Sequence, residues 1–189
     1  MDILYSDHNI AVIIKPVGLD SEQEIPAAIT QALGGEIFPI HRLDKNVGGV
    51  MVYARTKTAA ASLSKAVQEG LMIKEYVALV HGMPPEAGDW EDFLFKDSRK
   101  NKVFVVKRER KGVKKARLEF KRLSEGENSL VHVRLHTGRT HQIRVQFASR
   151  GFPLLGDRKY GASVSGEIGL EAYRLQITHP KGNLLQFEL

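Results

Sequence analysis

The sequence predicts an α+β fold with a mixed, mainly antiparallel β-sheet and flanking helices. Segments rich in β-forming residues outnumber helical ones, and several of them follow one another with only a short polar turn between. Strands and helices do not alternate regularly, as a purely parallel sheet would require. The chain has 189 residues, of which 42% are hydrophobic, so we expect one core and a single domain over residues 1–189.

The first half of the chain contains three predicted strands and two predicted helices. The runs "ILYSD" and "IAVIIKP" predict two strands joined by the polar turn "DHN". A short helix is predicted at 26–35, because Pro26 is tolerated in a first turn and a Gly pair ends the segment. "VMVYA" (50–54) predicts a buried strand. The alanine-rich segment 57–70 predicts the clearest helix, with an apolar stripe on one side.

The second half is richer in strands. In the strand predicted at 73–82, Tyr76, Ala78 and Val80 share one face, because side chains alternate along a strand. Residues 84–89 ("PPEAGD") predict a loop. A helix is predicted at 140–151, with Thr140 as its N-cap. Alternating or β-rich patterns predict the remaining strands at 102–106, 116–123, 130–135, 172–178 and 184–189.

Charge and cysteine content limit the possible functions. The chain has 28 Lys and Arg against 22 Asp and Glu, a net charge of +6, which suits an anionic partner such as RNA or DNA. The basic run 107–115 is either a solvated hairpin connection or an RNA-contacting loop. The absence of cysteine excludes disulfides and thiolate chemistry. No signal peptide or bilayer-length apolar run is visible, so we expect a cytoplasmic protein that does not enter a membrane.

Asp44 is the first candidate for chemistry. It lies in "HRLDKNVGGV" (41–50), between basic residues and a glycine pair, where the chain leads into a buried strand. A carboxylate at such a junction could stand at the edge of a cleft. An aspartate that only forms a turn is the alternative, and this stretch alone leaves both open.

The second candidate region is the polar segment 135–161. A helix that begins near Thr140 would direct free N–H groups at a phosphate or a carboxylate. Arg144, in the second turn of that helix, either serves such a site or faces solvent. The segment contains the polar residues His136, Arg139, His141, Gln142, Arg144, Asp157, Arg158 and Tyr160.

No cofactor or metal is indicated. The spacing of His132, His136 and His141 matches no compact ligand motif. The chain has neither a phosphate-binding P-loop nor a nucleophile elbow, and its glycine pairs lack the rest of a dinucleotide fingerprint.

Three segments resemble motifs of the RluA-type pseudouridine synthases. "HRLDKNVGGVMVYA" resembles the first motif, "KEYVALVHG" the second and "TGRTHQIRVQFASRGFPLLGDRKYG" the third, in the family's order. "THP" and "LLQFEL" near the C-terminus resemble the family's last strands. The resemblance implies a pseudouridine synthase fold with a central RNA-binding cleft. It implies a catalytic domain without an S4 module, which uses no metal and no cofactor.

The implied reaction isomerises uridine to pseudouridine in structured rRNA or tRNA. The enzyme breaks the N-glycosidic bond, rotates the base and rejoins it through C5. Asp44 matches the catalytic aspartate, which either adds as a nucleophile or removes the 2′ proton. Tyr76 matches the tyrosine that lies against the target base. Arg144 matches the arginine that pairs with the aspartate and keeps it ionised.

The resemblance also implies RNA contacts. Arg42 matches the arginine of the first motif and is expected to enter the RNA stack as the uridine flips out. Arg139 and His141 are expected to face RNA phosphate or to support the site. His41 and Lys74, which stand in the first and second motifs, are also expected to contact RNA. We expect the protein to be a monomer, because no exposed apolar helix face stands out.

The chain departs from the family at one place in the first motif. Val47, Gly48 and Gly49 stand where the family usually has Thr-Ser-Gly, so two hydroxyls are absent and the loop is expected to be more flexible. This departure supports a non-catalytic RNA-binding or ribosome-assembly protein as the alternative function. A hydrolase that uses Asp44 and His41 is a third hypothesis, although no third catalytic group supports it.

Overall fold

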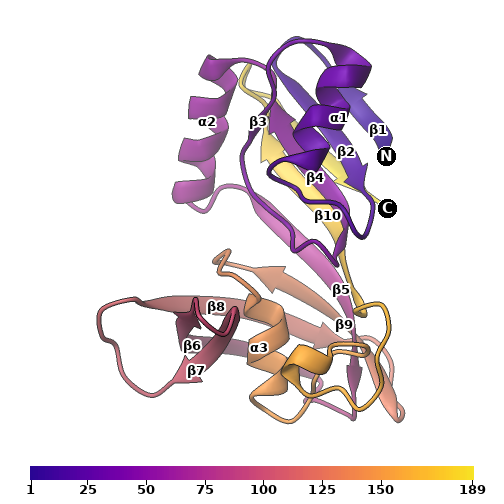
Figure 1. Cartoon of the computed structure of the whole chain (residues 1–189), viewed down its shortest axis with the longest axis vertical. Coiled ribbons are helices and arrows are strands. Elements are labelled where there is room, and N and C mark those ends of the chain that lie inside the picture. The colour runs from indigo at the N-terminus through magenta and orange to yellow at the C-terminus, as the bar shows by residue number, and fades with distance from the viewer. The chain divides into compact units, whose positions relative to one another are not determined.

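The computed structural model describes all 189 residues, which form eleven strands, three α-helices and one 3-10 turn (Figure 1). This confirms the predicted α+β class. No helix combines the length and apolar character needed to cross a membrane. The chain divides into two compact units, one of residues 1–74 and 171–189 and one of residues 75–170. The single-domain prediction is not tested by this division and stays a prediction.

The first unit contains a mixed sheet with the strand order β1-β2-β4-β10, to which β3 adds beside β4 and β11 beside β10. The β4–β10 pair is parallel, and the β1–β2, β2–β4, β3–β4 and β10–β11 pairs are antiparallel. Helix α2 packs its Ala59 and Leu63 into the core of this unit. The elements are β1 (Asp2–Ser6), β2 (Ile10–Lys15), α1 (Glu24–Leu33), β3 (Phe38–Pro39), β4 (Gly48–Ala54), α2 (Lys57–Gln68), β10 (Leu170–Thr178) and β11 (Leu184–Glu188).

The strands of the second unit follow the order β5-β9-β8-β6-β7, and the pairs from β9 to β7 are antiparallel. Helix α3 covers one face of this sheet (Figure 1), where Phe147 packs against Trp90 and Phe120 with ring centroids 4.8 and 5.2 Å apart. The elements are β5 (Ile73–His81), β6 (Ala87–Asp97), β7 (Lys102–Val106), β8 (Val113–Arg122), β9 (Asn128–Leu135), α3 (Gln142–Ala148) and the 3-10 turn η1 (Arg158–Tyr160).

Strand β6 corrects the predicted loop at 84–89, because residues 87–89 already belong to it. The core-facing positions of β6 include a glycine and the carboxylate Asp92, so the apolar alternation is broken. Gly88 is required there, since a Cβ atom would lie 2.4 Å from the ring of Phe120. A glycine in this position resembles a turn signal when only the sequence is read.

Helix α3 is shorter than the predicted 140–151, and Thr140 is not its N-cap. His141 occupies that position in a left-handed conformation (φ 52°) and makes no side-chain cap. The N–H of Gln142, the first helical residue, donates to the carbonyl of Arg139. The protein itself therefore uses one of the N–H groups that the sequence assigned to an anion site at the start of α3.

Candidate functional site

Asp44 lies in the first unit, in the connection between β3 and β4, and is half-buried. Its carbonyl accepts a hydrogen bond from the N–H of Val47 (2.9 Å), so the residue does form a turn. The preceding residue, Leu43, accepts from the Ser21 hydroxyl through its carbonyl (3.0 Å), and its N–H lies 3.3 Å from the same oxygen. Ser21 therefore fixes the backbone on the N-terminal side of the carboxylate.

The C-terminal side of Asp44 is held by a buried lysine. The carbonyl of Lys45 accepts from the N–H of Gly18 (2.8 Å) and from Nζ of Lys15 (3.3 Å). Burial lowers the pKa of Lys15, while the negative charges of Asp20 and Asp44 act in the opposite direction. Lys15 was not predicted as a site residue from the sequence. A lysine at the end of an apolar strand, directly before a proline, is the signal that could have indicated it.

His41 is not a basic residue in this fold. Its Nε2 accepts a hydrogen bond from the N–H of Val52 (3.3 Å), and its buried Nδ1 has no partner. Burial, together with the positive charge of Lys74, lowers the pKa of His41 to about 3. The ring is therefore neutral at pH 7, but such a low pKa makes it a weak base, and its Nε2 lone pair is already used by Val52, so His41 is poorly suited to the general-base role in the hydrolase hypothesis. The RNA contact of His41 stays a prediction, for a neutral ring.

The cations that flank Asp44 reach the surface. Arg42 lies 3.4 Å from Glu22 and keeps 46% of its side chain exposed. Lys45 lies 3.2 Å from Glu24 and is also largely exposed. Exposed pairs of this kind are easily exchanged for other partners. The predicted RNA contact of Arg42 is not tested here and stays a prediction.

The glycine pair is not a flexible loop, which corrects the expectation from the sequence. Gly48 and Gly49 are the first residues of β4, and both are buried. Gly49 has φ 121°, and a Cβ atom on it would lie 2.3 Å from the carbonyl oxygen of Ala172 on β10. A Cβ on Gly48 would lie 3.3 Å from the carbonyl of Lys15. The pair therefore permits close packing of backbone behind the aspartate loop.

In the second unit, Arg144 is buried and ion-paired. Its Nε and Nη2 donate to the two oxygens of Asp157 at 2.6 and 2.9 Å, with 7% and 1% of the side chains exposed. The alternative of a solvent-facing arginine is therefore wrong. Asp44 and Arg144 belong to different units, and their implied pairing stays a prediction.

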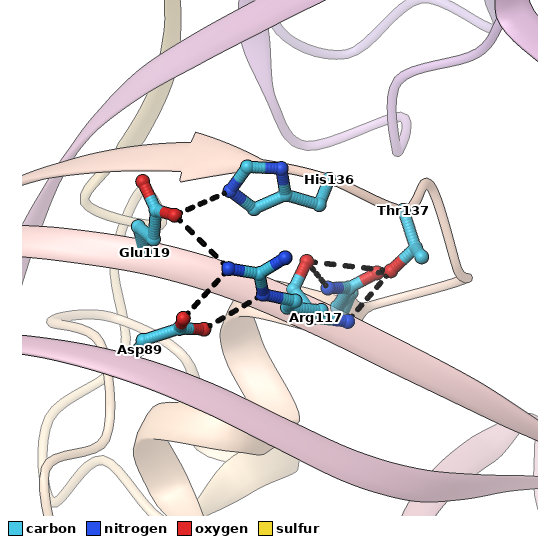
Figure 2. Close-up of polar contacts among 6 residues, drawn as sticks. Asp89, Arg117, Glu119, His136 and Thr137 are labelled. Atoms are coloured by element: carbon cyan, nitrogen blue, oxygen red, sulfur yellow. Dashed lines mark hydrogen bonds and ion pairs between the residues drawn. The ribbon is translucent and has the colours of Figure 1, made fainter. Parts of the chain in front are cut away.

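The turn that precedes α3 is held by the backbone of Arg117 on β8, as Figure 2 shows. The N–H of Arg117 donates to the hydroxyl of Thr137 (2.9 Å), and its carbonyl accepts from Nε2 of Gln142 (3.0 Å). Oε1 of Gln142 accepts from Thr137 (2.8 Å) and from the N–H of Arg139 (3.1 Å). The buried amide of Gln142 thus closes the turn that carries Arg139 and His141.

The two predicted RNA contacts in this turn differ in exposure. Arg139 is exposed, and its Nε donates to the carbonyl of Lys115 (2.9 Å). His141 is half-buried, with Nδ1 2.8 Å from the hydroxyl of Tyr160. That hydroxyl also accepts from the N–H of Val103 (2.9 Å), so Tyr160 joins β7 to the turn that carries His141.

Tyr76 lies on β5 with only 6% of its surface exposed, and it shares a face with the buried Ala78 and Val80, as predicted. Lys74 precedes it on the same strand and is half-buried. The catalytic role of Tyr76 and the RNA contact of Lys74 stay predictions.

The three neighbouring histidines have separate partners. His132 lies 3.4 Å from Glu75, His136 lies 2.9 Å from Glu119, and His141 contacts Tyr160. The chain has no cluster of three or more His, Asp or Glu side chains arranged to hold a metal ion.

Comparisons with known proteins agree with the motifs. A family model described as RNA pseudouridylate synthase matches residues 9–149. An uncharacterized RNA pseudouridine synthase of Aquifex aeolicus is 37% identical over 100% of this chain and 69% of its own length. The ribosomal large subunit pseudouridine synthase D of Borreliella burgdorferi is 31% identical over 98% of this chain and 63% of its own length.

The fold has close counterparts among solved structures. Human RNA Pseudouridylate Synthase Domain Containing 4 superposes with a TM-score of 0.84 over 100% of this chain and 87% of that one, at 24% identity. That likeness concerns the fold alone. The family match spans well over half of the chain and includes the aspartate loop and α3. The chain belongs to the RNA pseudouridylate synthase family.

Proposed function

We propose that this protein isomerises uridine to pseudouridine in RNA, with Asp44 as the catalytic carboxylate. The observation that carries the proposal is the anchoring of the backbone on both sides of Asp44, by Ser21 at Leu43 and by Lys15 and Gly18 at Lys45. A backbone held in this way gives the carboxylate a defined position before RNA binds, as catalysis requires.

In the proposed reaction the bond between N1 of the base and C1′ of the ribose breaks, and C5 then bonds to C1′. N1 gains a proton, and the hydrogen on C5 is lost to solvent. Asp44 either adds to the substrate as a nucleophile or removes the 2′ proton as a base, and Tyr76 lies against the base. The proposal includes a monomeric, cytoplasmic protein and requires no cofactor.

The loss of hydrogen from C5 supplies the test. Wild-type protein is incubated with RNA that carries tritium at C5 of uridine, and the release of tritium is measured. We expect release by the wild type and a rate at least about a thousandfold lower for Asp44→Asn, which keeps the shape of the side chain but removes its charge. The matched control is Asp2→Ala, which removes an exposed aspartate on β1 of the same unit and should match the wild type.

Two results would contradict the proposal in different ways. Wild-type turnover by Asp44→Asn would exclude Asp44 as the catalytic group. Failure of the wild type to release tritium from any RNA fraction, with RNA binding intact, would favour the non-catalytic RNA-binding protein.

The name of the Borreliella burgdorferi relative makes ribosomal RNA the first substrate to test, with tRNA as the second. Pseudouridines are mapped in rRNA and tRNA from cells with and without this gene. We expect one or a few positions to lose the modification and to regain it when wild-type protein, but not Asp44→Asn, is supplied.

A further inference from the structure

The positive charge of the chain is concentrated in one segment. Residues 102–117, which form β7, the following loop and the first half of β8, contain eight lysines and arginines and one glutamate. The other 173 residues contain 20 basic and 21 acidic residues. This basic segment therefore carries a charge of +7 and the rest of the chain −1, so an anionic partner is drawn to the segment.

Three aromatic side chains share one face of the sheet where β6 pairs with β7 of this segment. Phe95 on β6 is the direct cross-strand partner of Phe104 on β7, and Phe93 lies two residues before Phe95. Because side chains alternate along a strand, all three rings point to the same side of the sheet. Leu94 and Val103 point to the other side and pack in the core beside α3. Phe93, Phe95 and Phe104, here called the aromatic face, are only half-buried.

Each ring of the aromatic face has a cation beside it. The guanidinium of Arg110 lies 5.1 Å from the ring centroid of Phe95. The ammonium groups of Lys102 and Lys115 lie 5.8 Å from the centroids of Phe104 and Phe93. Lys115 also lies 3.5 Å from Glu91 in an exposed pair, which exchanges readily for another anion. Aromatic rings bordered by mobile cations provide stacking surfaces and phosphate contacts in one place.

We propose that the aromatic face binds a single-stranded segment of RNA, whose bases stack on the phenyl rings while its phosphates contact the basic residues at 102–115. The identity of the partner as RNA rests on the proposed function. The restriction to single strands follows from the geometry, because the faces of paired bases are covered by their neighbours in a duplex. A duplex would contact the cations only.

The test compares a short fluorescent oligouridylate with an RNA duplex of the same length, by anisotropy titration of the full chain. We expect the double variant Phe95→Leu/Phe104→Leu to bind the single strand about tenfold or more weakly, because base stacking on an aromatic ring is lost. Its affinity for the duplex should not change. The matched control is Phe187→Leu, which removes a half-buried phenyl ring that contacts Tyr5 in the first unit and should leave both affinities unchanged.

A second variant tests the proposed contacts between the basic residues and the RNA phosphates. Arg110→Gln/Lys111→Gln should weaken the binding of both RNAs and lower the slope of log affinity against log salt by about one to two. An unchanged single-strand affinity of Phe95→Leu/Phe104→Leu, in a variant with the circular dichroism of the wild type, would overturn the proposal. If the wild type binds neither RNA, the proposal is also overturned, and a protein becomes the partner to test for the aromatic face.

Tritium release separates this proposal from the proposed function. If the wild type releases tritium and the aromatic variants bind single strands normally, the isomerase proposal stands and the RNA-binding role of the aromatic face is wrong. If the wild type binds single strands through the aromatic face but releases no tritium, the RNA-binding role of the aromatic face stands and the isomerase proposal is wrong.

Discussion

Two arginine–aspartate pairs of the second unit have nearly the same geometry and very different surroundings. Arg144 donates to both oxygens of Asp157 at 2.6 and 2.9 Å, and Arg117 donates to both oxygens of Asp89 at 2.9 and 2.7 Å. The first pair is 7% and 1% exposed, the second 44% and 51%. The difference therefore lies in access to water rather than in contact distance.

Burial decides how much such a pair contributes to stability and how firmly it orients its side chains. In the exposed pair, water can replace either partner and Glu119 can replace Asp89, so the side chain of Arg117 contributes little even though the bond raises its pKa and lowers the pKa of Asp89. In the buried pair, Asp157 holds Arg144 in one orientation, and the charge of Arg144 has no water to replace a lost partner. The buried pair is the one that stands in the predicted catalytic motif.

The largest expected effect is that of Asp157→Ala. The substitution removes both charged hydrogen bonds of a buried ion pair, so the free energy of unfolding should fall by about 3–5 kcal/mol, as measured by urea denaturation. The matched control is Asp89→Ala, which breaks the exposed pair of the same geometry and should leave the urea midpoint close to that of the wild type. Equal losses of unfolding free energy in the two variants would show that burial does not distinguish the two pairs.

His41 extends the comparison to a buried group that has no charged partner. Its pKa is lowered from 6.5 to about 3, so between these pH values the unfolded chain binds a proton that the folded chain does not. The stability that neutral His41 contributes is therefore complete above pH 6.5 and is lost as the pH falls toward 3, by up to about 1.4 kcal/mol per pH unit. Urea denaturation of the wild type and of His41→Gln at several pH values measures this slope. A wild-type slope that His41→Gln does not flatten would show that another group is responsible.

A smaller effect is expected for Tyr160→Phe. The variant keeps the ring beside Arg144 but removes the hydroxyl that joins the N–H of Val103 to His141. Leaving a buried N–H unpaired should lower the free energy of unfolding by about 1–2 kcal/mol. The histidine NMR signals should also report a change in the tautomer balance of His141. Tyr173→Phe, on a strand of the first unit, is the control and should leave the His141 signals unchanged.

The smallest effect is expected for Arg117→Ala. The Arg117 backbone holds Thr137 and Gln142 through its N–H and carbonyl, and the substitution keeps both groups (Figure 2). Tritium release should therefore match the wild type in low and in high salt. Arg117→Pro, which removes the N–H, should disturb the turn before α3 and reduce release. Equal activities of the two variants would show that the backbone contact does not position this turn.

Much of the fold could be predicted because it follows from local patterns. Alternating apolar residues predicted the strands that the structure has at β5, β7 and β9, and the alanine-rich segment predicted α2. Strand β6 was missed because Gly88 and Asp92 occupy its inward positions, and only contact with Phe120 and α3 explains them. The start of α3 was misplaced because a side chain from inside the helix, Gln142, closes the preceding turn.

For the candidate site, the sequence by itself determined the family and the residues that match its motifs, because three long motifs in the same order are specific. Only the tertiary structure decided the protonation states of those residues and the contacts that hold them in place. His41 is neutral because burial disfavours its charge, and Arg144 tolerates burial because Asp157 meets it across the fold. Gly49 stands near the start of β4 because Ala172, 123 positions later, leaves no room for a Cβ atom. Charge state and steric room depend on neighbours that are distant in the chain, and no local pattern records them.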